Sequence, residues 1–182
     1  MRRPLALASL VLTAFLAAPD PAHAVFSGEM SPRAHSGDAD YAAGVRAWRD
    51  MDWPAMVEHL QKVVARRPWH DNAHTLLGYG YRRMGDYDRA FHHYDTALGL
   101  NDRHRGALSY MGIAYLHLDD TPQANATLAR LREVCDFVAL TFSDGDFSSG
   151  CDEYHELKGA IEHFVDTGEV IDICPDVGRP DA

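Results

Sequence analysis

The sequence predicts an all-α protein in which helical hairpins stack side by side as an α-solenoid, and three observations carry this prediction. Residues 71–104 show the apolar and small-residue spacing of two helices joined by a short turn. The same spacing recurs once before this stretch and once after it, at one constant shift along the chain. The amphipathic stretch after the last hairpin has one apolar face, as a helix that closes the end of such a stack requires.

The central hairpin, residues 71–104, shows what the spacing does. Small residues let two helix backbones approach closely, and large residues fill the space around the contact. The residues that carry this pattern are His74, Leu77, Gly78, Tyr81, Ala90, Tyr94 and Ala97. Their spacing resembles that of the tetratricopeptide repeat, a family whose fold is a scaffold for interactions and says little about chemistry.

The recurrence makes the resemblance specific. Four sets of positions coincide when the chain is shifted by one repeat length: Gly44, Gly78 and Gly112; Ala47, Tyr81 and Tyr115; Met56, Ala90 and Ala124; and Leu60, Tyr94 and Leu128. An aspartate also recurs before each second helix, where its side chain is expected to cap that helix. We therefore divide this part of the chain into three repeats, 37–70, 71–104 and 105–138.

The first repeat departs from the family pattern, because Asp40 stands where a large aromatic residue is usual. Terminal repeats are often atypical, since one of their sides faces solvent.

The start of the chain predicts export. Residues 1–24 have a basic start, an apolar run from Leu5 to Ala18, and Ala22-His23-Ala24 as a small-x-small cleavage site. This is the layout of a signal peptide cleaved near Ala24, which places the mature protein in a bacterial periplasm or outside the cell. A bilayer span needs about 20 apolar residues, so no permanent anchor is expected. Residues 25–36 have no period and are expected to form a flexible lead-in.

Three segments follow the repeats. Residues 139–150 are rich in Gly, Ser and Asp and predict a loop. Residues 151–166 predict a capping helix, and residues 167–182 an acidic tail. From Phe137 onwards there are 11 acidic and 2 basic residues, which argues against nucleic acid as a partner.

The three cysteines predict one disulfide. Cys135 lies near the end of the last repeat and Cys151 opens the capping helix, and antiparallel neighbouring helices bring such ends together. We expect these two to be bonded, with Cys151–Cys174 as the competing pair. Cys174 is then free or joins a second molecule.

The sequence does not predict an enzyme or a cofactor. No cysteine has the setting of a nucleophile, and no glycine-rich phosphate loop or CxxC pair is present. The eleven histidines, among them His70, His74, His92 and His93, suggest an alternative role in binding a metal or small molecule. The first pair straddles a helix start and the second points in two directions, so surface histidines are favoured and no metal site is assigned.

The family resemblance implies that the first helices of the repeats line a concave groove that binds a partner protein or peptide. By that resemblance the lining residues are Tyr41, Val45, Trp48, Arg49, Thr75, Tyr79, Arg82, Arg83, Ser109, Ile113, Leu116 and His117. Aromatic residues and arginine often anchor interfaces, so Trp48 and Tyr79 are expected to pack on the peptide and Arg82 and Arg83 to bind its acidic groups. Two alternatives are open: the chain's own lead-in or acidic tail lies there, or these residues pack within the stack.

The predicted function is therefore a non-enzymatic adaptor or assembly factor of the periplasm. The identity of the partner and the oligomeric state do not follow from the sequence.

Overall fold

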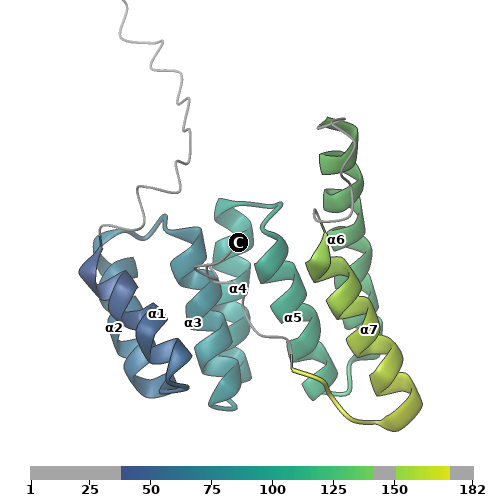
Figure 1. Ribbon diagram of the computed structural model, residues 1–182, viewed down its shortest axis with the longest axis horizontal. Helices are drawn as coiled ribbons and strands as arrows, with labels where there is room; N and C mark the ends of the chain where they lie inside the picture. The colour runs from purple at the N-terminus through teal and green to yellow at the C-terminus, as the bar shows by residue number, and fades with distance from the viewer. Residues whose placement is uncertain (1–37, 142–150, 173–182) are drawn as a thin grey trace, which may run out of the picture. The chain divides into compact units, whose positions relative to one another are not determined.

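The structure is a computed structural model that describes residues 38–141 and 151–172. In these ranges it has seven helices and no strand: α1 (Ala39–Arg49), α2 (Trp53–Arg66), α3 (Asp71–Arg83), α4 (Tyr87–Leu100), α5 (Arg105–His117), α6 (Thr121–Thr141) and α7 (Asp152–Thr167). Figure 1 shows them as hairpins placed one after another. Each hairpin packs on the next, α2 on α3 and α4 on α5, and α7 covers α5 and α6. The predicted all-α solenoid with a capping helix is confirmed.

The predicted signal peptide (1–24), the lead-in (25–36), Cys174 and the tail beyond residue 172 lie outside the described residues.

The last repeat runs further than predicted. α6 ends at Thr141, so the loop that we expected to begin at residue 139 begins later. Residues 137–140 are Phe, Val, Ala and Leu, which continue a helix, and the first Gly after them is Gly145. α7 is close to its predicted bounds, and it ends at Gly168 in a left-handed conformation with φ of 75°.

The turns inside the three hairpins are built alike. Asp52, Asp86 and Asp120 each accept a hydrogen bond from the backbone N–H three residues later, at 3.1 Å. The predicted aspartate caps are confirmed. The residue before each of them has positive φ, which is 56° at Met51, 78° at Gly85 and 58° at Asp119.

Glycines set how closely the helices approach. A Cβ on Gly44 would lie 2.9 Å from Leu60 of α2, and one on Gly78 would lie 2.5 Å from the ring of Tyr94 in α4. Gly112 of the third repeat instead faces α7, where the nearest atom of Leu157 would be 2.6 Å away. Leu157 of the capping helix α7 therefore packs on Gly112 in the same way as Leu60 of α2 packs on Gly44 and Tyr94 of α4 packs on Gly78.

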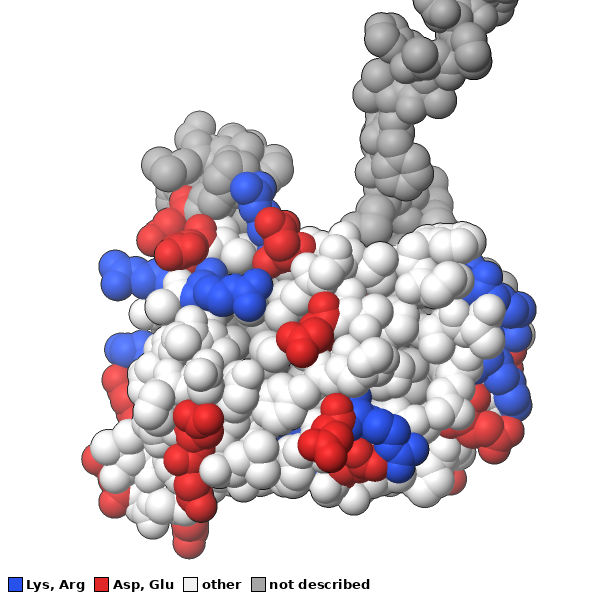
Figure 2. All heavy atoms as spheres, turned by 180° about the vertical axis from the view of Figure 1, so that it is seen from behind, with Lys and Arg blue, Asp and Glu red and all other residues white. Residues whose placement is uncertain are grey.

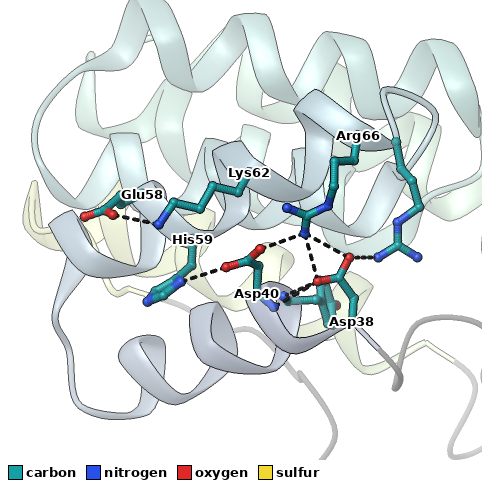
Figure 3. Close-up of polar contacts among 8 residues, drawn as sticks. Asp38, Asp40, Glu58, His59, Lys62 and Arg66 are labelled. Atoms are coloured by element: carbon teal, nitrogen blue, oxygen red, sulfur yellow. Dashed lines mark hydrogen bonds and ion pairs between the residues drawn. The ribbon is translucent and has the colours of Figure 1, made fainter.

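Ion pairs connect the start of α1 with the end of α2 in the first repeat (Figure 3). Asp38 caps α1 and binds Arg67 of the α2 end, while Arg66 lies 2.7 Å from Oδ2 of Asp40. Asp40 also lies 3.3 Å from Nδ1 of His59. The aspartate that departs from the family pattern is thus an ion-pair partner between α1 and α2.

A disulfide joins the last two helices. Cys135 of α6 is bonded to Cys151, the residue before α7, with the two Cα atoms 5.8 Å apart. The predicted pairing is confirmed. The bond closes a loop of about 15 residues, for which the chain-entropy estimate is about 3 kcal/mol.

We expect Gly78→Ala to lower the free energy of unfolding by about 1–3 kcal/mol, because its methyl group overlaps the buried ring of Tyr94. Gly99→Ala is the matched control, since Gly99 lies in α4 with nothing within 4 Å of a built Cβ. The control should gain about 0.5–1 kcal/mol from helix propensity. Urea unfolding followed by circular dichroism measures both, and a stabilised Gly78→Ala would contradict the packing described.

We expect the double variant Cys135→Ser, Cys151→Ser to lose about 3 kcal/mol of unfolding free energy. Cys174→Ser, whose sulfur is not part of this bond, serves as the control and should unfold at the same urea concentration as the unmodified protein. Equal midpoints for all three proteins would show that the bond does not hold α7 on the stack.

Candidate functional site

The twelve residues predicted to line the groove divide into two groups in the structure. Six of them are buried and do not line an open surface: Thr75, Tyr79, Arg82, Ser109, Ile113 and Leu116. These six side chains pack within the stack, where α3 contacts α2, α4 and α5, and α5 also contacts α6 and α7. The remaining six keep some exposure: Tyr41, Val45, Trp48, Arg49, Arg83 and His117. Their contact with a partner stays a prediction.

A carboxylate of the chain itself lies against this face. Arg82 Nη1 donates to Oδ1 of Asp172, and Arg83 Nη1 lies 3.1 Å from Oδ2. His117 Nε2 lies 3.3 Å from Oδ1 of Asp172 and 3.1 Å from Arg82 Nη1. We call Arg82, Arg83 and His117 the Arg82 site. Of the two alternatives left open by the sequence, the acidic tail therefore occupies this place as far as residue 172.

Aromatic rings hold the two arginines of the Arg82 site. The guanidinium carbon of Arg83 lies 4.8 Å from the ring centroid of Trp53, and that of Arg82 lies 5.0 Å from the ring centroid of Tyr79. Trp53 and Tyr79 contact each other edge to face at 5.7 Å. Cations over aromatic faces are favoured electrostatically, so the rings of Trp53 and Tyr79 stabilise the two arginines in this position.

Arg82 is the most deeply buried cation of the site, with a side chain only 1% exposed. It lies close enough to the Tyr94 hydroxyl to interact with it, but within the described ranges its Nε and Nη2 atoms make no hydrogen bond of normal geometry. Buried donors without partners cost free energy, so this guanidinium favours a ligand with several acceptor atoms.

The electrostatics of the site suit an anion. The hydrogen bond with His117, together with the charges of Arg82 and Arg83, holds the pKa of Asp172 well below its usual range, although partial burial opposes this. The carboxylate is therefore ionised at neutral pH.

Two of the histidines cap helices. Nδ1 of His70 accepts from Ala73 N–H at 3.1 Å at the start of α3, and Nδ1 of His104 accepts from Ala107 N–H at 3.2 Å at the start of α5. They occupy the same position in successive repeats, one repeat length apart in the sequence. That shared register was the signal in the sequence that could have revealed them.

A second histidine pair is packed inside the second repeat. Nδ1 of His74 lies 3.0 Å from Nδ1 of His93, and Nε2 of His74 bonds the carbonyl oxygen of Pro68 at 3.0 Å. The ring of His93 is stacked on Tyr81 at 5.5 Å. Burial, then the neighbouring His74 and His92, lowers the pKa of His93 to about 4. Burial likewise lowers the pKa of His74, so both rings are neutral near pH 7.

The described residues contain no group of three or more His, Cys, Asp or Glu side chains placed to hold a metal ion. Within the same residues no helix is both long and apolar enough for a bilayer span. Figure 2 shows the face behind that of Figure 1, where acidic and basic side chains are intermixed and do not gather into one basic stripe.

Comparison with known proteins shows which class of fold the chain has. Residues 107–134 match the family described as tetratricopeptide repeat. The structure is similar to the TPR2B domain of yeast Sti1 in its complex with pHsp70, with 15% identity, 66% of this chain and 94% of that chain covered, and a TM-score of 0.54. No curated protein sequence matches the chain.

Two further solved structures are similar. The TPR domain of Sgt2 from Aspergillus fumigatus has 12% identity and a TM-score of 0.58, with 82% of this chain and 93% of that chain covered. The CopN–Scc3 complex contains a chain with 19% identity and a TM-score of 0.52, with 82% of each chain covered. The class is that of helical repeat solenoids: residues 107–134 match a tetratricopeptide repeat, and the fold is similar to that of solved tetratricopeptide-repeat domains.

Acid should destabilise the fold through the buried histidines. The pKa of His93 is about 4 in the folded protein and 6.5 when unperturbed, so between these values the unfolded chain binds protons that the folded chain does not. We expect the thermal midpoint to fall as the pH is lowered from about 6.5 to 4. In His93→Asn the fall should be smaller, since the amide cannot protonate. An equal fall in both proteins would contradict the assignment to His93.

Proposed function

We propose that this protein is a non-enzymatic interaction scaffold of an exported system, and that it binds a partner protein through the face that α1, α3 and α5 form around the Arg82 site. The observation that carries the proposal is the placement of Asp172, since this face holds the ionised carboxylate of the segment after α7 between two arginines and a histidine. The same chemistry suits an acidic segment of another protein.

Two of the similar structures support the interaction role, because their titles describe protein complexes, one with pHsp70 and one of CopN with Scc3. The likeness is one of fold, and the partner of this chain has its own chemistry. Lys and Asn, which chaperone-binding members of the family use to grip a terminal carboxylate, are absent from the predicted lining of this chain. The partner that we propose is accordingly recognised by arginine, histidine and aromatic side chains.

The export part of the proposal rests on residues 1–24 and on the disulfide. A bond between Cys135 and Cys151 is typical of an oxidising compartment, and the signal-peptide layout provides the route there. Amino-terminal sequencing of protein recovered from the periplasm of an expressing bacterium should begin near Val25.

The alternative role in metal binding has less support. His70 and His104 use Nδ1 as cap acceptors, and His74 and His93 face each other in a neutral pair. These rings are occupied by structural contacts. Calorimetric titration with zinc or copper should show no stoichiometric uptake by the exported form, and uptake at one ion per chain would favour the alternative.

Site-specific photo-crosslinking tests the scaffold role. With p-benzoylphenylalanine at position 49, a predicted groove residue at the end of α1, we expect crosslinks in the native cell to a defined partner, identified by mass spectrometry. The matched control is position 125, an exposed residue of α6. The partner should not crosslink from there. Equal capture from both positions, or none from position 49, would contradict binding at this face.

A further inference from the structure

We infer that the segment Glu169–Asp172 is an internal ligand, whose Asp172 carboxylate fills the Arg82 site and leaves it when an acidic residue of a partner binds. The inference deepens the proposed function and rests on it, because an internal ligand has a role only if this face binds something else.

The fold delivers this segment to the site. α7 ends at Gly168, whose left-handed conformation turns the chain away from the helix axis. Glu169 N–H then bonds Oγ1 of Thr167 at 3.1 Å, and Val170 packs half-buried against the core. Figure 1 shows the segment passing from the end of α7 towards the end of α5. Asp172 thereby meets Arg82, which is 90 residues earlier in the chain.

The attachment is of a kind that a competitor can replace. The Asp172 side chain is 34% exposed, those of Arg83 and His117 are 28% exposed, and Ile171 beside it is 46% exposed. Contacts as accessible to water as these are weak individually. A competing carboxylate can therefore reach Arg83 and His117 while Asp172 is still bound.

The site is also incompletely satisfied by Asp172. Its carboxylate bonds Nη1 of Arg82, while Nε and Nη2 lack hydrogen-bond partners in the part of the chain described. Guanidinium groups bind best when several donors are used together. A partner segment with an Asp or Glu after apolar residues, and with a second acceptor for Arg82, would match the site better than the internal ligand does.

The short connection to α7 explains why Asp172 occupies the Arg82 site when no partner is bound. A short connection to α7 holds Asp172 near the site at an effective concentration of about a millimolar. For an intrinsic Kd of about 0.1 mM, a free peptide of equal affinity then binds about tenfold more weakly to the intact protein than to one whose internal ligand is disabled.

The experiment uses full-length chains and a fluorescein-labelled peptide, Gly-Glu-Val-Ile-Asp-Ile-amide, which copies residues 168–173. Binding is followed by fluorescence anisotropy. Asp172→Asn should bind the peptide about tenfold more tightly than the unmodified protein does. Glu169→Gln is the control, since it removes the same charge from an exposed position of the same segment, and it should bind like the unmodified protein.

Two further measurements assign the effect to the site. Adding Arg83→Gln to Asp172→Asn should remove the gain, and a peptide with Asn in place of its Asp should bind no variant better than the unmodified protein. Equal affinity of Asp172→Asn and the unmodified protein, or no binding by any variant, overturns the internal ligand.

The outcome separates this inference from the proposed function. If position 49 captures a partner while Asp172→Asn changes nothing, the scaffold role stands and the internal ligand is wrong. If Asp172→Asn opens the site to the peptide while position 49 captures nothing, the internal ligand stands and the scaffold role is wrong.

Discussion

The structure depends on the close approach of helices at three glycines. Gly44, Gly78 and Gly112 each receive a large side chain that would collide with a Cβ atom. A contact that tolerates no methyl group fixes both the distance between two helices and their register along the axis. The face that carries the Arg82 site inherits its geometry from these contacts, because Arg82 lies one turn after Gly78 on α3.

The Arg82 site shows how a helical array makes a polar site from mostly buried parts. Tyr79 is within the core, yet its ring supports the arginine that reaches the carboxylate. The tail adds the missing anion, so a buried cation is neutralised without any acidic residue from the repeats. Function and stability are coupled here, since removing the anion leaves a guanidinium that is nearly buried and unpaired.

Periodicity made the fold predictable from the sequence. Three coincident glycines and three coincident aspartates defined the hairpins, and the antiparallel arrangement of neighbouring helices then defined the Cys135–Cys151 pair. Six of the twelve predicted groove residues are buried, because the repeat spacing tells which side of a helix a residue faces and not what covers that side. The contact of Asp172 with Arg82 spans 90 residues and has no periodic signal, so only the folded chain reveals it.

The prediction of surface histidines was wrong for His70, whose side chain is buried at the start of α3. In the sequence, a histidine that caps a helix cannot be distinguished from one that binds a metal. Only the structure shows that the imidazole accepts a hydrogen bond from a backbone N–H at the helix start. His70 and His104 precede α3 and α5 by one residue, where Ser, Thr, Asp or Asn is usual.

The two ends of the described array are closed by different chemistry. Ion pairs of Asp38 and Asp40 with Arg66 and Arg67 hold the first hairpin, while a covalent bond holds the last helix. In an array with contacts only between neighbours, opening starts at the weaker end and spreads along it. Dissolved salt screens the first closure and leaves the second intact. We therefore expect unfolding to begin at the amino-terminal hairpin and to begin more readily at higher ionic strength.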